Sequence, residues 1–258
     1  DGESFLVVWD DTRDSAYDRI YGARVGADGD VLDPAGIAIA TSGYDQLTYP
    51  DVAFDGSVYL VVWDNDNTHI YGRLVSTEGD PLGSNYLSIC GAANNQRYPR
   101  AASNGEGFLV VWEDGRLSQY SYDIFGARVS SLYGLLDEDG IAIASLMGLQ
   151  QRPAVASDGS DYLVVWQDER FSANEDIYGA RVAADGAVVD VDGFSVATAS
   201  GAQSDPAVAF ADDEYLVAFA DTRSAATTGA DLYGARVSTD GASLDPSGFL
   251  VSAEDGDE

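Results

Sequence analysis

The feature that most constrains this chain is a sequence block that recurs five times. One copy, Tyr162 to Val182, reads YLVVWQDERFSANEDIYGARV: an apolar run, an acidic loop and a second apolar stretch. The aromatic residue that ends the first run recurs at intervals of 54, 49, 54 and 53 residues, at Trp9, Trp63, Trp112, Trp166 and Phe219. A period of this length, sustained along the chain, predicts a repeat architecture.

Each repeat contains four strand-like pieces. A short Pro-led piece such as RPAVA comes first, then LVVW, then IYGARV, then a piece such as GIAIA. Asp-Gly and Asn-Gly pairs between pieces are typical of hairpin turns, and no segment has the apolar period of a helix. We therefore expect an all-β fold, a five-bladed β-propeller of four-stranded antiparallel blades. It should form a single domain, 1–258, with blades near 1–45, 46–94, 95–148, 149–201 and 202–258.

The LVVW runs are apolar at consecutive positions, so these strands should be buried on both faces between neighbouring sheets. A ring would give every blade two neighbours. The first repeat begins at its second piece, because no Pro-led strand precedes Phe5. Blade 1 should therefore have three strands, and its unfilled inner edge could accept a strand from another chain.

On these motifs the chain resembles five-bladed β-propellers, a class that includes animal lectins and arabinan-degrading glycosidases. The LVVW and IYGARV pair is also similar to repeats of uncharacterised secreted bacterial and archaeal proteins. The resemblance covers nearly the whole chain and rests on blade number and repeat length. It implies no catalytic residues.

The chain has 44 acidic and 13 basic residues, a formal net charge of −31, and all 13 basic residues are Arg. Such a chain lacks the basic face that nucleic acid requires, and we expect neither nucleic-acid partners nor membrane insertion. Two explanations of the acidity remain open, adaptation to high salt and calcium binding by a secreted protein. We expect an extracellular or cell-surface location, in keeping with the second explanation.

Acidic residues follow the repeat aromatic two positions later, at Asp11, Asp114, Asp168 and Asp221, and an Arg follows two further on. We interpret these carboxylates, with Trp9, Trp63, Trp112 and Trp166, as structural. The alternative is a ring of carboxylates presented to calcium or sugar hydroxyls. Acids before the third strand, Asp123, Asp176 and Asp231, are expected to pair with its Arg residues from blade to blade: Arg24, Arg128, Arg181 and Arg236.

A unique site would have to break the repeat. Asp64 and Asp66 lie in an oxygen-rich loop of the second repeat and are candidate calcium ligands, although the glycine and Glu of a full EF-hand loop are absent. Asp51 and Arg100 follow the Pro of successive first strands, and they are candidates for either a salt bridge or a polar ligand anchor. Loop aromatics are candidate sugar-stacking residues: Tyr17, Tyr44, Tyr120, Tyr122 and Phe171.

These observations predict a non-catalytic extracellular or cell-surface module that binds a glycan or protein partner, or a structural spacer. The near-identical repeats and the absence of a recognised catalytic constellation favour this interpretation. The alternative is a glycoside hydrolase or lyase that uses carboxylates around the central channel, since a suitably spaced pair would suffice for that chemistry.

Overall fold

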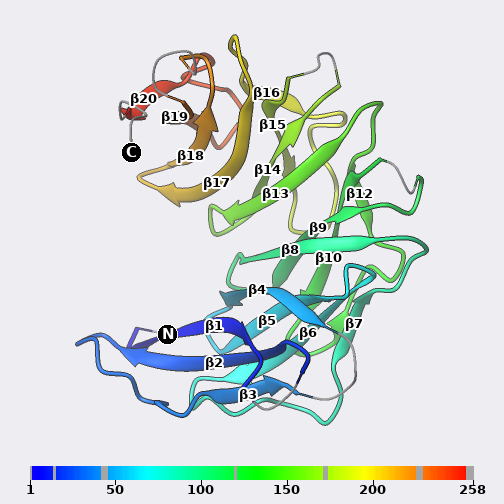
Figure 1. Ribbon diagram of the computed structural model, residues 1–258, viewed down its shortest axis with the longest axis vertical. Coiled ribbons are helices and arrows are strands. Elements are labelled where there is room, and N and C mark those ends of the chain that lie inside the picture. The colour runs from blue at the N-terminus through cyan, green and yellow to red at the C-terminus, as the bar shows by residue number, and fades with distance from the viewer. Residues whose placement is uncertain are drawn as a thin grey trace.

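The computed structural model describes residues 2–13, 16–41, 46–118, 121–170, 174–224 and 229–253. These residues form twenty β-strands in five antiparallel sheets and contain no helix. The sheets follow one another in an arc, from β1 to β20 (Figure 1). The fold is the expected β-propeller with five blades. A search of the described residues for a helix able to cross a membrane found none.

Each sheet contains strands that are consecutive in the chain. Blade 1 contains β1 (Ser4–Asp11), β2 (Arg19–Gly26) and β3 (Ile37–Ala40). Blade 2 contains β4 (Leu47–Phe54), β5 (Val58–Asn65), β6 (His69–Ser76) and β7 (Leu87–Cys90). Blade 3 contains β8 (Gln96–Ser103), β9 (Phe108–Asp114), β10 (Asp123–Ser130), β11 (Gly134–Leu135) and β12 (Ile141–Ala144).

Blade 4 contains β13 (Gln150–Ser157), β14 (Tyr162–Asp168), β15 (Asp176–Val182) and β16 (Phe194–Ala197). Blade 5 contains β17 (Gln203–Ala211), β18 (Glu214–Asp221), β19 (Asp231–Ser238) and β20 (Phe249–Ser252). Blade 1 has three strands, as the sequence predicts. The two-residue strand β11 was not expected, and it corresponds to isolated bridges in the other blades, such as Val25 with Val31.

Apolar side chains from facing sheets form four core clusters, one at each joint between consecutive blades. The cluster between blades 1 and 2, for example, joins Leu6 and Ile39 to Tyr59, Val61 and Trp63. The second strands β5, β9 and β14 are buried along nearly their whole length, which confirms the expectation for the LVVW runs.

The terminal blades differ from this pattern. In the described part of the chain no core cluster joins blade 5 to blade 1, and the two blades lie at opposite ends of the arc (Figure 1). Strand β1 accordingly alternates between buried and exposed residues at its start. The expectation that closure of the ring hides both outer faces was wrong, because each outer face has no neighbouring sheet in this structure.

Candidate functional site

The inner strands of blades 2 to 5 share a backbone irregularity immediately before their Pro. The residue at this position has a positive φ, 53° at Tyr49, 54° at Tyr98, 53° at Arg152 and 49° at Asp205. The ladder to the second strand changes register at the same place in each blade. This is the geometry of a β-bulge, which redirects side chains, and Pro fits beside it because Pro offers no N–H to the ladder.

The redirected side chains meet in a cluster that we call the inner-strand site. The rings of Tyr49 and Tyr98 pack edge to face with centroids 4.5 Å apart. The guanidinium of Arg152 lies 4.4 Å from the centroid of the Tyr98 ring, and its Nε lies 3.7 Å from Asp205 Oδ1. A cavity of about 160 Å³ is lined by Tyr98, Arg100, Arg152 and Asp205 together with Pro153 and Pro206.

Of the predicted pair Asp51 and Arg100, the second lines this cavity and the first is bonded to the strand that carries it. Arg100 is one of its lining residues, and Asp51 Oδ2 accepts a hydrogen bond of 2.9 Å from the N–H of Ala101. Burial raises the pKa of the Asp51 carboxyl, although the Ala101 N–H and the charge of Arg100 act in the opposite direction. The inner-strand site therefore has one exposed carboxylate, Asp205, among its cavity residues, and a second carboxyl, Asp51, bonded to the strand that carries Arg100.

The predicted salt bridge between Asp51 and Arg100 does not occur among the ion pairs of the described residues. Arg100 instead donates through Nη1 to the carbonyl of Pro99 at 2.9 Å. The alternative interpretation of the two residues, as polar anchors for a ligand, remains a prediction.

The repeated loop carboxylates have structural partners. Asp114 Oδ2 accepts hydrogen bonds from Trp112 Nε1 and Arg116 Nη2, each at 2.7 Å, and its Oδ1 accepts from the Arg116 backbone N–H at 2.8 Å. Asp168 with Trp166 and Asp11 with Trp9 repeat the arrangement, and in blade 5 Asp221 pairs with Arg223. The side chains of Asp114, Asp168 and Asp221 are fully buried in their ion pairs, so these three do not present a carboxylate ring to solvent.

The acids that precede the third strand do not form the expected ladder. Arg24, Arg128, Arg181 and Arg236 each pair with an Asp nine residues later in the same blade, at 2.7–2.9 Å. These partners belong to the turn before the fourth strand: Asp33, Asp137, Asp190 and Asp245. The prediction failed because this turn folds back onto the third strand. Asp123 is instead buried beside Asp114, and burial raises its pKa to about 6.

The candidate calcium ligands of blade 2 separate in the structure. Asp64 is fully buried and accepts hydrogen bonds from Thr48 Oγ1 at 2.9 Å and from the backbone N–H groups of Asn67 and Tyr98 at 3.3 Å. Asp66 is exposed in the β5–β6 turn. Within the described ranges no group of three His, Cys, Asp or Glu side chains could hold a metal ion. Asp64 instead bonds the inner strand of blade 3 to blade 2.

Of the loop aromatics, only Tyr17 and Tyr122 belong to the described residues; Tyr44, Tyr120 and Phe171 lie outside them. Tyr122 stacks under the guanidinium of Arg97, 3.9 Å from the ring centroid, and Arg97 also lies 5.1 Å from the Tyr98 ring. Tyr122 is therefore connected to the inner-strand site through Arg97. Tyr17 packs against Arg19 in blade 1, away from this group.

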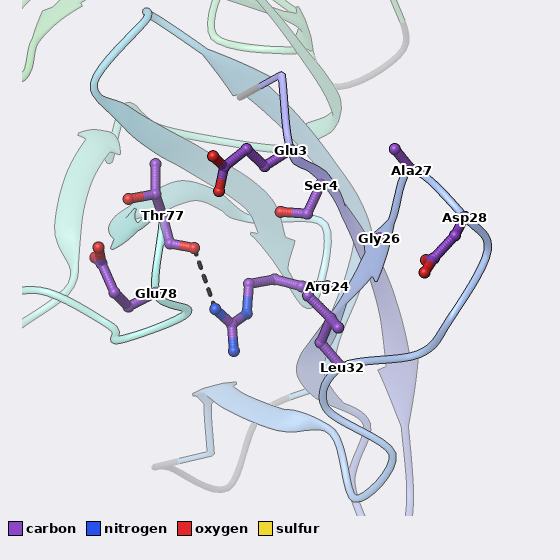
Figure 2. A pocket seen from close by; sticks show the side chains of 9 residues that line it. All are labelled: Glu3, Ser4, Arg24, Gly26, Ala27, Asp28, Leu32, Thr77 and Glu78. Atoms are coloured by element: carbon purple, nitrogen blue, oxygen red, sulfur yellow. Dashed lines mark hydrogen bonds between the residues drawn. The ribbon is translucent and has the colours of Figure 1, made fainter.

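Another cavity, of about 560 Å³, lies elsewhere. Figure 2 shows it at the joint of blades 1 and 2, where Arg24 donates to the carbonyl of Thr77 at 3.3 Å and acidic side chains such as Glu3 and Glu78 line the rim. A second cavity occupies the corresponding joint of blades 3 and 4, around Arg128 and Ala184. Since the crevice recurs between blades, we regard it as a property of the architecture.

Sequence reasoning singled out Asp51 and Arg100 but missed Tyr49, Tyr98, Arg152 and Asp205. The available signal was their position, since each stands immediately before a Pro at the start of a short strand. The residue before Pro is restricted in conformation. The four positions carry two Tyr, an Arg and an Asp, so the side chain varies between repeats. The backbone conformation at these positions is the same in all four blades.

No family model matches the chain, and the comparison with curated proteins gave no match. Among solved structures, an endo-arabinase from Bacteroides thetaiotaomicron has a TM-score of 0.55 at 13% identity, over 81% of each chain. An α-L-arabinofuranosidase from Lactobacillus brevis has a TM-score of 0.51 at 13% identity, over 81% of this chain and 73% of its own. A subtype N10 neuraminidase-like protein of A/little yellow-shouldered bat/Guatemala/060/2010 has a TM-score of 0.53 at 12% identity, over 78% of this chain and 58% of its own.

At these identities the likeness establishes the β-propeller fold. It also corrects the interpretation of the chain as a non-catalytic binding module or spacer, because the arabinases and arabinofuranosidases that share the fold are glycoside hydrolases. The findings favour the alternative prediction. Near-identical blades do not exclude a unique site, since the residues before Pro in the inner strands differ from blade to blade.

Proposed function

We propose that the protein is a glycoside hydrolase whose active centre is the inner-strand site. The observation that carries this proposal is a cavity lined by Tyr98, Arg100, Arg152 and the exposed Asp205, with a second carboxyl in a different environment, Asp51, bonded to the N–H of the residue after Arg100. Hydrolysis of a glycosidic bond uses one protonated carboxylic acid and one ionised carboxylate. Environments that separate the pKa values of two carboxyls are what such a division of roles requires.

In this proposal Asp51 is the general acid. Asp51 is half-buried, and burial raises its pKa, which favours the protonated form that would donate to the leaving oxygen. Asp205 is the carboxylate partner, since its side chain is 70% exposed and Arg152 lies beside it. Its role would be that of the nucleophile or the general base.

Tyr98 and Tyr49 would contact the sugar ring, and Arg100 and Arg152 would hydrogen-bond its hydroxyls. Faces of aromatic rings suit the apolar faces of sugars, and guanidinium groups offer several donors in a fixed geometry. The cavity of about 160 Å³ is smaller than the roughly 300–1,000 Å³ of typical ligand pockets. We therefore expect it to hold one end of a glycan.

The arabinase and the arabinofuranosidase that share the fold suggest the first substrates, arabinan and arabinofuranosides. An extracellular location is part of the same proposal, since the acidic chain would meet a glycan polymer outside the cell. The test is hydrolysis of linear arabinan and of aryl α-L-arabinofuranosides by the unmodified chain and by Asp51→Asn, Asp205→Asn and Asp213→Asn. Asp213 is exposed in the β17–β18 turn and serves as the matched control.

We expect Asp51→Asn and Asp205→Asn to lower kcat/KM by about 10²–10⁴-fold, and Asp213→Asn to leave it unchanged. An aryl leaving group that needs no proton should rescue Asp51→Asn but not Asp205→Asn, because only the general acid assists departure. Absence of turnover on a wide panel of glycans, or equal activity of all variants, would overturn the proposal.

A further inference from the structure

The outer faces of the two terminal blades are apolar and exposed. In blade 1, Phe5 is 67% exposed and Val7 is 49% exposed. The equivalent residues in blades 2 to 5 face the preceding blade and are only 0–4% exposed. They are Tyr59, Phe108, Tyr162 and Tyr215 for Phe5, and Val61, Val110, Val164 and Val217 for Val7. In blade 5, Leu216, Leu232 and Val251 are 43–54% exposed. Their equivalents in blades 1 to 4 are 0–7% exposed against the following blade: Leu6, Leu60, Leu109 and Leu163; Ile20, Ile70, Ile124 and Ile177; Ile39, Ile89, Ile143 and Val196.

These two faces are the two halves of the joint that occurs four times within the chain. At the joint of blades 4 and 5, Tyr215 and Val217 belong to one core cluster with Leu163, Ile177 and Val196. The outer faces of blades 1 and 5 carry the same kinds of side chain, but there they are exposed. Blade 1 has an aromatic residue and Val, and blade 5 has Leu, Leu and Val. Because several large apolar side chains gathered on one exposed face are unusual in isolated soluble domains, these faces indicate a contact surface.

The polar contacts of the joint point to the same pairing. In blades 2, 3 and 4 the residue after the repeat aromatic accepts a backbone N–H from the inner strand of the next blade: Asp64 from Tyr98, Glu113 from Arg152 and Gln167 from Asp205. In blade 5 this position is Ala220, which has no side-chain acceptor. Blade 5 is therefore suited to a neighbour without an inner strand, and blade 1 is the blade without one.

The outer Arg residues add a further contact. Nη1 of Arg24, Arg128 and Arg181 donates to a carbonyl in the turn of the next blade, from Thr77, Ala184 and Thr239, at 3.3–3.4 Å. Arg236 of blade 5 is 49% exposed, and its Nη1 lies 3.5 Å from Glu214. The carbonyl of Ala27 in the first turn of blade 1 corresponds to these acceptors.

We propose that blade 5 of one copy of this chain docks on blade 1 of a second copy, so that copies join head to tail through a fifth joint of the internal type. The two faces of a single copy lie at opposite ends of the arc (Figure 1), so a second copy can bring them together where one copy does not. A heterologous contact of this kind continues until a ring closes or a filament grows. The net charge of −31 opposes it at low salt, so association should strengthen as salt screens the charge.

The test uses one charged substitution on each face. Val7→Asp blocks blade 1, Leu216→Asp blocks blade 5, and Leu132→Asp is the control, since Leu132 is 83% exposed in the β10–β11 turn outside both faces. Mass is measured by light scattering over a concentration series in about 1 M NaCl, where the Debye length is about 3 Å. Because all three positions are exposed, the variants should fold, and circular dichroism checks this.

We expect the unmodified chain and Leu132→Asp to increase in mass with concentration, and the Val7→Asp and Leu216→Asp variants each to stay monomeric. A mixture of these two variants should form dimers and stop there, because only one intact pair of faces remains. Association of either variant alone, a monomeric unmodified chain, or a mixture that remains monomeric would overturn the proposal. If blade 5 instead docked on blade 1 of the same copy, every sample would stay monomeric. A dimer in the mixture of variants therefore distinguishes the two arrangements.

Discussion

Asp114 shows how one buried carboxylate holds a blade together. It bonds the Trp112 indole, the Arg116 backbone and the Arg116 guanidinium at once, and it has no contact with solvent. Removal of one partner from a buried ion pair leaves the other charge uncompensated. The arrangement recurs in blades 1 and 4, so it sets the path of the loop between the second and third strands.

We predict that Asp114→Asn lowers the free energy of unfolding by about 2–3 kcal/mol, below the usual range for buried pairs because the Arg116 side chain is 18% exposed. Urea unfolding measures the change. Asp66→Asn, in the exposed β5–β6 turn, is the control and should change stability by less than about 0.5 kcal/mol. Equal stability of both variants would show that the Trp–Asp–Arg contacts contribute nothing net.

For Asp123 we predict that loss of the carboxylate increases the stability of the fold, in contrast to Asp114. Burial raises its pKa from 3.8 to about 6, and nearby Asp114 adds to the increase. The folded state therefore binds this proton more tightly than the unfolded state does. The resulting stabilisation is complete below about pH 4 and is lost as the pH rises through about 6.

Asp123→Asn removes the buried charge and keeps a polar group of the same size. We expect the variant to be more stable than the unmodified chain by about 1–3 kcal/mol near pH 7.5, and to show no gain near pH 4. Urea unfolding at the two pH values tests this. A gain of the same size at both would mean that the effect is one of packing rather than titration.

The inner-strand site illustrates what sequence could and could not predict at the residue scale. Asp51 and Arg100 broke the repeat visibly and were identified, and the structural role of Asp114 followed from its repetition. Tyr98, Arg152 and Asp205 were missed because the position they share, immediately before Pro, does not by itself show that their side chains meet. Only the positive φ before Pro brings side chains of three blades into one cluster.

At the scale of elements, the inner strands are bonded to the preceding blade through the same bulge. Glu113 is fully buried, accepts the Arg152 N–H at 2.8 Å and pairs with Arg97 Nε at 2.8 Å. Other blades have different residues at the position equivalent to Glu113. Gln167 keeps the acceptor for the next blade, and Ala220 removes it.

We predict a graded series from these variants. Glu113→Gln should lower the free energy of unfolding by about 1–2 kcal/mol through loss of the Arg97 pair, while the bond to Arg152 persists. Glu113→Ala should lower it by about 3 kcal/mol or more, since it also leaves a buried N–H unsatisfied. Denaturant unfolding distinguishes them, and equal losses for Gln and Ala would refute the contact between strands as the cause.

The strands themselves were predictable because the same strand pattern recurs in five repeats of the sequence. The LVVW runs indicate burial on both faces, and β5, β9 and β14 have it. In β1 the same run leaves Phe5 and Val7 exposed. A repeat pattern reports what each blade can pack against, and whether a neighbour is present depends on the curvature of the whole arc, which no single repeat encodes.

At the scale of the whole molecule, the dominant quantity is the charge of −31 on 258 residues. Much of it lies on exposed Asp side chains of turns, where like charges repel across the surface. At low ionic strength the Debye length is about 30 Å, so this repulsion extends over the molecule and favours expansion. At about 1 M salt it falls to about 3 Å, and only direct pairs such as Arg128 with Asp137 still interact.

We therefore predict that the melting temperature rises steeply between low and molar NaCl, and that KCl has the same effect, because screening depends on ionic strength. Calcium gives the discriminating comparison. At constant ionic strength, millimolar CaCl₂ should add little, since no described cluster of acids has the geometry of a metal site. If millimolar calcium alone reproduced the full increase, bound metal rather than screening would account for the acidic composition. The same measurement on Asp64→Asn would then test whether blade 2 holds the ion.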